Sequence, residues 1–293
     1  LVKELEPGLN ALFGLEYKNY ANEHAEIFDT ETSDRAFEEE VMLSGFANAA
    51  VKPEGQGVTF DDAQETFTAR YTNETIALAF AITEEAIEDN LYDRLASRYT
   101  KALARSMANT KQVKAAAVLN NGFNANFAGG DGVALFATNH PTIAGTFSNE
   151  LAVASDLNET SLEQALIDIA AMTDERGLKI ASRGMKLIIP SALQFTADRL
   201  MKSEGRTGTA DNDINAVRNM GMIPEGYTVN HFLTSNKKWF IKTDVPNGLK
   251  HFVRSPIKTS MEGDFDTGNV RYKARERYVF GFSDPRGIFG SDI

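Results

Sequence analysis

The clearest pattern in the sequence is a run of strand-forming residues between positions 58 and 82. Residues 66–72 are rich in threonine and aromatic side chains, and the next residues alternate between large apolar side chains and alanine. The large apolar positions are Ile76, Leu78, Phe80 and Ile82. A period of two residues is typical of a β-strand. We therefore predict a long two-stranded feature over residues 58–82, with its tip near residues 50–58 or its turn near residues 73–74.

A helical pattern follows directly. From Thr83 to Asn121 the chain contains no glycine and no proline, and apolar residues recur about once per turn. Thr83 suits a helix N-cap, and Asn121–Gly122 suits a left-handed stop. The pattern predicts one helix of roughly 35 residues, about 50 Å long at ~1.5 Å per residue. A long helix beside an extended hairpin is more typical of an extended subunit than of a compact enzyme.

The N-terminal region carries few periodic signals. For residues 1–46 we expect an extended arm with one short helix over Asp34–Leu43. Residues 47–57 have the proline and glycine content of a loop. An arm that does not bury its own surface is expected to lie on something else.

The remainder of the chain mixes helices and strands. Short strands are expected around Val133–Phe136, inside a region over residues 122–150 that is rich in glycine and asparagine. An amphipathic helix is expected over Ser161–Arg176, with Ser161 as its N-cap. The apolar stripe of this helix consists of Leu162, Ala165, Leu166, Ile169 and Met172. The other expected elements are a buried strand over residues 185–189, a helix from Pro190–Ser191, a polar mobile loop over residues 203–213, and strands over residues 227–232, 238–242, 249–254 and 269–282. This order of elements predicts an α+β fold.

Composition narrows the functional classes. The chain has 293 residues, no cysteine and a net charge of −11. The absence of cysteine excludes disulfides, thiol catalysis and cysteine-ligated metals. An acidic chain is a poor general binder of nucleic acid. The charge is also uneven, because residues 1–50 are strongly acidic and residues 237–293 are basic. Such ends can attract each other between copies of the chain. No apolar run is long enough to span a membrane.

Candidate chemistry is sparse. The chain lacks the G-x-S-x-G elbow, the phosphate-binding loop and a G-x-G-x-x-G turn. The four histidines are far apart in sequence and are expected at surface turns and strand ends, so metal ligation by them is not expected; they are His24, His140, His231 and His251. Two calcium-loop-like segments, which begin at Asp211 and Asp264, lack the required glycine or glutamate. We expect the first to cap a helix and the second to form a turn. We predict no catalytic residue, no metal site and no cofactor.

Three segments resemble one known family. Residues 75–90 (TIALAFAITEEAIEDN) combine an alternating strand with a Thr-Glu-Glu helix start, residues 114–122 (KAAAVLNNG) end a long helix, and residues 184–190 (GMKLIIP) form a strand that ends in proline. In this order they resemble the major capsid proteins of tailed bacteriophages of the Hong Kong 97 type. The resemblance covers essentially the whole chain.

The resemblance implies a Hong Kong 97-like capsid fold with five parts. These are an N-terminal arm over residues 1–46, an extended β-hairpin loop over residues 47–82, a peripheral domain over residues 83–155 with the spine helix at 83–121, an axial domain over residues 156–248, and a return to the peripheral domain over residues 249–293. It also implies a leading scaffold segment that a protease removes, which would fit Leu1 being the first residue.

The function implied by the resemblance is structural. Copies of the chain would form hexamers and pentamers of an icosahedral virion shell that is assembled in the cytoplasm of the host bacterium. The shell would enclose double-stranded DNA without reading its sequence, and its partners would be a scaffold, a portal and cement proteins. Two alternatives remain open. One is an encapsulin-type nanocompartment that holds cargo enzymes, and the other is an α+β enzyme with a site in residues 122–150.

Within the capsid hypothesis, two groups of side chains are expected to contact neighbouring subunits. Residues 47–72 should reach over an adjacent copy, and the loop over residues 203–213 should lie near the five- and six-fold axes. Aromatic and arginine side chains dominate the energies of interfaces. Lys52, alone near a loop tip, could pair with an acid on a neighbour or, if desolvated, attack an asparagine side chain. The predicted contact residues are Lys52, Phe60, Phe67, Arg70, Tyr71, Arg199, Lys202, Glu204 and Arg206.

Overall fold

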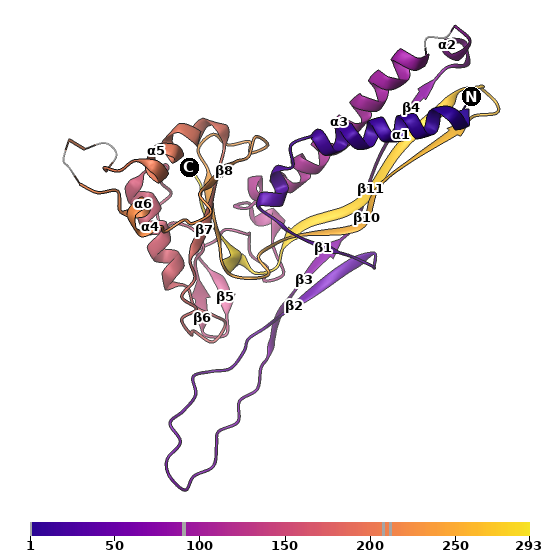
Figure 1. The fold of residues 1–293 in the computed structure, drawn as a ribbon. Helices are drawn as coiled ribbons and strands as arrows, with labels where there is room; N and C mark the ends of the chain where they lie inside the picture. The colour runs from indigo at the N-terminus through magenta and orange to yellow at the C-terminus, as the bar shows by residue number, and fades with distance from the viewer. Residues whose placement is uncertain (1, 90–91, 207–208, 211–212) are drawn as a thin grey trace.

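The chain folds into an elongated lobe and a compact lobe, with a long loop that projects away from both (Figure 1). The computed structural model describes residues 2–89, 92–206, 209–210 and 213–293. The N-terminus lies at the far end of the elongated lobe and the C-terminus lies in the compact lobe. Within the described residues, no helix has the length and apolar character needed to cross a bilayer.

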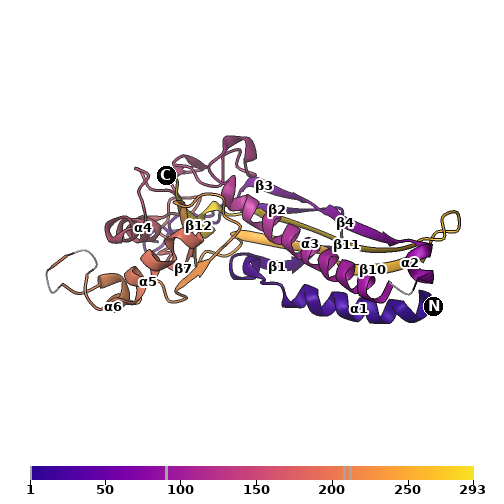
Figure 2. The same cartoon turned by 90° about the horizontal axis from the view of Figure 1, so that it is seen from above.

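The elongated lobe is a four-stranded sheet with two helices on one face (Figure 2). The strand order is β1 (Asp29–Thr32), β10 (Leu249–Gly263), β11 (Val270–Phe282) and β4 (Glu74–Ile82). β1 runs parallel to β10, and the other neighbours are antiparallel. Helices α1 (Val2–Asn19) and α3 (Tyr92–Asn120) pack on the sheet through a shared core. That core contains Leu9, Phe13, Ile82, Ala96, Leu103, Ala104, Met107, Tyr272 and Ala274.

The predicted long helix is present but is divided. A short helix, α2 (Glu84–Glu88), precedes α3, and Asp89 lies in a turn. The remaining junction, residues 90–91, lies outside the described residues. The 29 residues of α3 give a length of about 44 Å at ~1.5 Å per residue. The prediction of one continuous helix over residues 83–121 is therefore corrected at its first turns.

The prediction for the N-terminal region is wrong in two respects. The residues read as an extended arm form the 18-residue helix α1. Pro7 and two glycines lower its intrinsic helix propensity, but the burial of Leu9 and Phe13 against α3 outweighs that loss. The segment read as a helix over Asp34–Leu43 contains strand β2 (Phe37–Leu43) instead. Its side chains alternate between exposed and half-buried, and that period of two residues is the signal of a strand.

The two strands predicted within residues 58–82 exist, but they do not pair with each other. β3 (Glu65–Thr72) pairs antiparallel with β2, and β4 pairs with β11. The chain passes from one sheet to the other at Asn73, which is buried and donates side-chain hydrogen bonds to Ser33 and to the carbonyl of Arg35. The hairpin is therefore β2–β3, and its tip spans residues 44–64, which include the predicted tip near 50–58.

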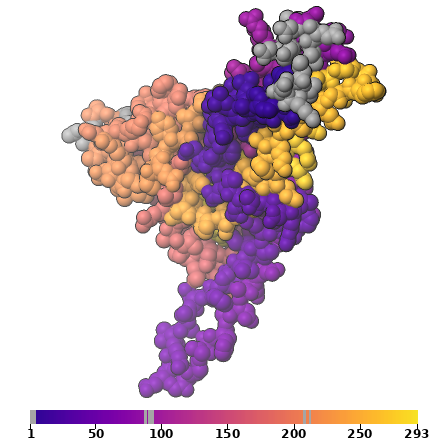
Figure 3. Space-filling model, turned by 45° about the vertical axis from the view of Figure 1, so that its right-hand side comes forward, coloured from indigo at the N-terminus to yellow at the C-terminus, as the bar shows by residue number. Residues whose placement is uncertain are grey.

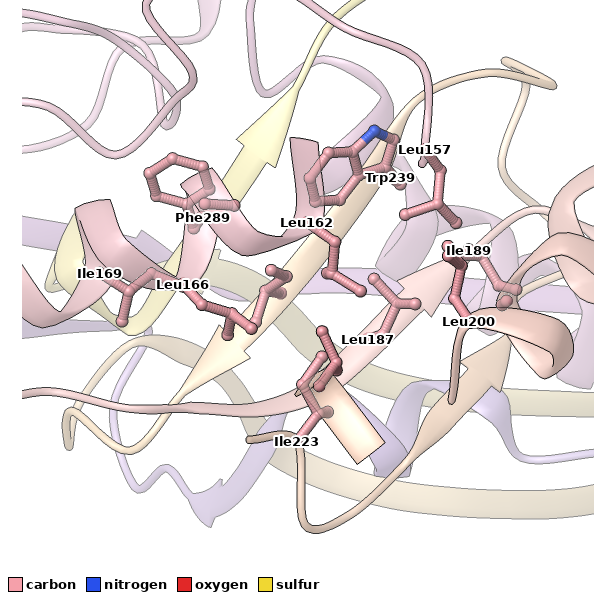
Figure 4. Close-up of a cluster of buried hydrophobic side chains, with 14 of the residues drawn as sticks. Leu157, Leu162, Leu166, Ile169, Leu187, Ile189, Leu200, Ile223, Trp239 and Phe289 are labelled. Carbon is pink, nitrogen blue, oxygen red and sulfur yellow. The ribbon is translucent and has the colours of Figure 1, made fainter. Parts of the chain in front are cut away.

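The compact lobe is a second four-stranded sheet surrounded by helices. Its strand order is β12 (Ile288–Ser291), β9 (Trp239–Thr243), β7 (Gly184–Ile189) and β8 (Tyr227–Val229). Its helices are α4 (Glu159–Ala171), α5 (Gln194–Lys202) and α6 (Ala216–Met220). Figure 4 shows how Leu162, Leu166 and Ile169 of α4 pack toward Leu187 and Trp239. The predicted apolar stripe of α4 is confirmed as core.

The ends of α4 differ from the prediction. Its N-cap is Asn158, whose side chain accepts a hydrogen bond from the Ser161 amide while the Ser161 hydroxyl accepts one from the Asn158 amide. This reciprocal pair is a capping box, so Ser161 lies inside the helix. The helix ends at Ala171 because Met172 adopts an extended backbone. The expected strand over 185–189, the helix after Pro190 and the cap formed by Asn215 are all confirmed.

The glycine-rich region over residues 122–150 differs from the prediction. Val133–Phe136 is not a strand, and the strands here are β5 (His140–Thr142) and β6 (Gly145–Phe147). The buried Leu135 carbonyl accepts a hydrogen bond from the Asn149 side chain instead of from a strand partner. Gly130 lies against the backbone of β3, because a Cβ atom there would be 2.5 Å from the Thr68 carbonyl oxygen.

The histidines are also placed differently from the prediction. His24, His140 and His251 are buried, and only His231 is exposed. The rings of His24 and His251 meet edge to face with centroids 5.0 Å apart, where α3 joins the β10–β11 sheet. Burial, followed by the charge of Lys111, lowers the pKa of His24 to about 4. Burial, followed by the charges of His24 and Lys111, lowers the pKa of His251 to about 3.

These two histidines predict a loss of stability in acid. Both imidazoles are neutral in the folded chain, whereas the unfolded chain binds their protons at a pKa of about 6.5. The free energy of unfolding should therefore fall as the pH drops from about 6.5 toward 4, by on the order of 2 to 3 kcal/mol per histidine. Urea denaturation between pH 7 and pH 4.5 measures this slope. His251→Gln should flatten this slope, and a slope equal to that of the wild-type chain would contradict the assignment.

Candidate subunit interface

The projecting loop, defined as residues 44–64 between β2 and β3, is a long exposed segment of the chain. Every side chain from Phe46 to Gln64 is exposed, and none of these residues belongs to a helix or a strand. Figure 3 shows the loop standing clear of both lobes. Four large apolar side chains lie on it, namely Phe46 (59% exposed), Val51 (93%), Val58 (67%) and Phe60 (94%).

Such exposure is unfavourable in an isolated chain. Burying a Val or Phe side chain contributes roughly 1.5 to 3 kcal/mol. A contiguous apolar surface left in solvent typically marks a site of interaction. The chain offers the projecting loop few contacts of its own, since Arg176 reaches only the end next to β3, with a hydrogen bond to the carbonyl of Asp62 and a 3.8 Å contact with Asp61. The loop is therefore the main candidate for contact with another molecule.

The base of the loop is fixed by a buried cation. The Lys250 side chain is 4% exposed, and its ammonium donates hydrogen bonds to Glu31 (2.8 Å) and Glu40 (2.5 Å). Burial opposes the charge, but the two carboxylates more than compensate, so the pKa of Lys250 is raised. Glu40 also accepts a hydrogen bond from Ser283, which contacts the Tyr71 hydroxyl. This group joins β1, β2, β3, β10 and the end of β11, and it orients the β2–β3 ribbon on the body.

The outward face of the ribbon is also partly apolar. Phe37, Val41 and Leu43 of β2 are 38%, 47% and 60% exposed. Across the strand pair, the guanidinium of Arg70 lies 4.0 Å from the centroid of the Phe37 ring and 3.9 Å from Glu39. The apolar surface of the loop therefore continues onto the strands that carry it.

The predicted contact residues of this region fall into different environments. Lys52 and Phe60 are exposed on the projecting loop, Arg70 is exposed on β3, and Phe67 is half-buried. Tyr71 is only 3% exposed and packs against Phe252, with ring centroids 4.8 Å apart. Tyr71 is therefore a core residue of its own chain, because the inward face of β3 rests on the elongated lobe. The sequence shows that Tyr71 is an aromatic residue in a strand, but it does not show which face of the strand its side chain occupies.

The second predicted group lies at the end of α5. Arg199, Lys202, Glu204 and Arg206 are all exposed. Three of them form ion pairs within the chain, namely Lys202 with Asp198 (2.5 Å), Glu204 with Arg218 (3.6 Å) and Arg206 with Glu159 (2.9 Å). Part of the polar loop predicted over 203–213, residues 207–208 and 211–212, lies outside the described residues.

Sequence reasoning missed the apolar surface beside this group. Phe195 on α5, Ile214 before α6 and Met220 at the end of α6 are 69%, 66% and 68% exposed. The sequence did contain a signal for them. Phe195 and Met220 are large apolar residues on short helices, and Ile214 is a large apolar residue beside a polar loop.

The buried charges do not form an accessible reaction site. His140 and Asp131 are the convergent titratable pair that an enzyme in residues 122–150 would need, with Nδ1 of His140 and Oδ2 of Asp131 2.6 Å apart. Their side chains are 0% and 2% exposed, so no substrate reaches them. Arg286 is equally buried and contacts Glu175 and Asp284. Among the described residues, no three potential ligands gather around a possible metal ion.

Comparisons with known proteins agree with this architecture. Residues 65–290 match the model of a family described as phage capsid protein. No curated protein sequence matches the chain. Among solved structures, the chain is similar to a virus-like particle from Pyrococcus furiosus, with 11% identity and a TM-score of 0.55 over 97% of this chain and 98% of that chain.

Two further structures have a similar fold. The capsid of a native GTA particle is 14% identical, with a TM-score of 0.53 over 91% of this chain and 88% of that chain. A chain of Mycobacterium phage Adephagia is 12% identical, with a TM-score of 0.51 over 93% of this chain and 91% of that chain. At such identities the likeness establishes the fold alone. The predicted α+β, Hong Kong 97-like capsid fold is confirmed.

The buried cation at the base of the loop generates a stability prediction. Lys250→Met leaves Glu31 and Glu40 without their cation, so the free energy of unfolding should fall by about 3 kcal/mol. Lys242 is the matched control, because it pairs with Asp29 of the same strand β1 at a more exposed position. Lys242→Met should cost less than about 1 kcal/mol. Urea denaturation at pH 7 measures both, and equal losses would contradict a special role for Lys250.

Proposed function

We propose that this chain, which belongs to the phage capsid protein family, is the major subunit of an icosahedral virion shell. Its copies would form hexamers and pentamers that close a head around double-stranded DNA. The observation that carries this proposal is the projecting loop, whose Phe and Val side chains are 59% to 94% exposed in the chain itself. A shell subunit needs such a surface, since it gains its remaining buried area from neighbours.

The parts of the chain can be given roles in that shell. We propose an N-terminal segment over residues 1–36, a peripheral domain over residues 83–155 and 249–293, and an axial domain over residues 156–248. The pairing of β2 with β3 moves the base of the extension hairpin to residues 37–72. The end of α5, with Arg199 and Arg206, would lie toward the five- and six-fold axes.

The physics of closed shells supports this division. A contact between two different surfaces of identical subunits is heterologous, and such contacts close into rings when the rotation allows. A loop that extends from one copy onto the next makes such a contact. Individual contacts can be modest, because many of them act together in a closed particle.

The remaining partners follow from the family. We propose a scaffold segment or scaffold protein during assembly in the cytoplasm of the host bacterium, a portal at one vertex and cement proteins on the outer surface. The DNA would be enclosed without recognition of its sequence, which agrees with the net charge of −11. We propose no catalytic activity and no cofactor for the chain.

Electron microscopy of the full chain, expressed alone and purified, tests the proposal. Closed shells tens of nanometres wide are expected, and packaged DNA in particles from infected cells would identify a virion. Shells filled with a cargo enzyme would favour a nanocompartment instead. The likeness to a virus-like particle, at 11% identity, does not choose between these two. Monomers with no rings or shells at any concentration would contradict the proposal.

The projecting loop generates a sharper prediction. Val58→Ser together with Phe60→Ser should abolish closed particles, because the substitution removes two apolar anchors from the contact between copies. The free energy of unfolding of the monomer should change by less than about 0.5 kcal/mol, since both side chains are exposed in the chain itself. Sedimentation velocity measures particle formation. Thr59→Ala, at an exposed position between the two, is the control and should assemble normally. Normal particles from the double variant would argue against the loop as an anchor.

A further inference from the structure

The exposed face of α3 carries a row of cations. The sequence of α3 contains six lysine and arginine residues and a single acidic residue, although the whole chain has a net charge of −11. Arg94, Arg98, Lys101 and Arg105 follow each other at intervals of four, three and four residues, and residues three or four apart lie on one face of a helix. All four side chains are exposed. We name these four residues the helical row.

Most of the helical row is without a partner inside the chain. The other two cations of α3, which are lysines, pair with glutamates of the sheet. Arg105 pairs with Glu16 of α1, with 2.6 Å between Nε and Oε1. Arg94, Arg98 and Lys101 form no ion pair with a carboxylate of the described residues. These three cations can therefore bind a negatively charged partner.

The helical row is unfavourable for α3 itself. Like charges four residues apart repel each other, which applies to Arg94 with Arg98 and to Lys101 with Arg105. Arg94 also lies in the first turn of α3, where the positive end of the helix dipole disfavours a cation. A partner with negative charge would relieve both effects.

The side chains next to the row suit a phosphate backbone better than a protein. Ala102, Ser106 and Asn109 are exposed on this side of α3. Tyr99 is 42% exposed, but its ring packs on Phe80 of the same chain. Arginine, lysine, serine and asparagine side chains are typical ligands of DNA phosphates. The core of a protein interface is instead depleted of charge and enriched in aromatic residues.

The length of the row also fits DNA. The three unpaired cations span about 10 Å along the helix at ~1.5 Å per residue. Double-stranded DNA carries one negative charge per about 1.7 Å of its axis, so several phosphates lie within that length. Each of the three cations can therefore contact a phosphate of its own.

A second basic surface lies on the opposite face of the same sheet. Lys273 and Arg275 of β11 are exposed there, because the residues that alternate with them are buried against α1 and α3. Acids interrupt this surface, since Arg271 lies opposite Glu262 and pairs with Asp264. In a shell one subunit thick, only one of the two faces can line the interior. The helical row is the better candidate, because acids are nearly absent from α3.

We propose that the helical row binds the phosphate backbone of the enclosed DNA, so that the face of the elongated lobe with α1 and α3 forms the inner wall of the shell. This inference rests on the proposed function and adds the surface that meets the DNA. Phosphate contacts carry no sequence information, as a container for any DNA requires. Three contacts per copy are weak, but many copies act together on one DNA molecule.

Binding of a short labelled DNA duplex to the unassembled full chain tests the inference. Unassembled chain is obtained with Val58→Ser and Phe60→Ser, or at concentrations too low for shells to form. Fluorescence anisotropy measures the affinity over a series of salt concentrations. Three phosphate contacts predict a slope of log K against log salt of about −2.7, and Arg98→Ala with Lys101→Ala should reduce it to about −0.9. The same two substitutions should weaken binding at low salt at least about tenfold.

Lys273→Ala with Arg275→Ala is the matched control, because it removes the same charge from the opposite face of the same lobe. It should leave the affinity and the slope unchanged, and urea denaturation verifies the fold of each variant. A chain that does not bind the duplex, or a slope that falls in the control and not in the α3 variant, would overturn the inference. Polyglutamate that binds α3 more tightly than the duplex would assign the row to an acidic protein segment instead.

A second measurement separates the inference from the function on which it rests. Closed shells of the wild-type chain should not bind a duplex added from outside, because the row faces the interior. Closed shells that bind it through Arg98 and Lys101 would place the row on the outer wall, which overturns the inference and leaves the shell function in place. A wild-type chain that binds the duplex through α3 but never forms shells would contradict the proposed function itself.

Discussion

The ammonium of Lys250 is buried between Glu31 and Glu40. It connects elements of the chain whose relative positions have to be fixed. Strand β1, the β2–β3 ribbon and the long β10–β11 pair meet at this one cation. A buried charge is costly unless its partners are in place, so the three elements are held in a single arrangement or not at all. The direction in which the projecting loop leaves the body follows from that arrangement. Without it, the ribbon would be a two-stranded element with little stability of its own.

A rigid base gives an otherwise unstructured loop a defined function. Ordering a loop on a partner costs conformational entropy for each residue that becomes fixed. The cost is smaller when the loop starts from a fixed position and direction, because fewer arrangements have to be searched. The chain thus buries its hydrophobic cores and leaves large apolar side chains exposed on the projecting loop. That distribution distinguishes a shell subunit from an enzyme, whose specialised groups converge on an accessible pocket.

Local patterns in the sequence predicted the elements with strong periodicity, and the structure agrees with them. The alternation in β4, the long apolar stripe of α3 and the stripe of α4 each reflect burial on one face, which is a local property. The errors arose where distant residues decide the outcome. The segment Asp34–Leu43 was expected to be a helix, but pairing with β3 and the cation of Lys250 stabilise the strand β2 there. The weak periodicity of residues 1–46 favoured an extended arm, but packing on α3 stabilises the helix α1. The partners of β3 and β4 are set by contacts with residues 37–43 and 270–282, which no short window contains.

The contact residues could be predicted only in part, for a related reason. Phe60 and Lys52 lie in a segment with loop composition, so their exposure followed from the sequence. Tyr71 and Arg70 are adjacent on one strand and point to opposite faces, and only the packing of β3 on Phe252 decides which of them is buried. The positive charge of the C-terminal region was visible in the sequence, but the alignment of its cations on one face of the sheet required the register of β10 and β11.

The most direct test of the account is a cryo-electron microscopy map of the assembled particle at a resolution that traces the chain. The account predicts closed shells in which residues 44–64 of each copy lie on a neighbouring copy, with Val58 and Phe60 buried. A map in which this loop folds back onto its own subunit, or remains in solvent within a closed shell, would contradict it.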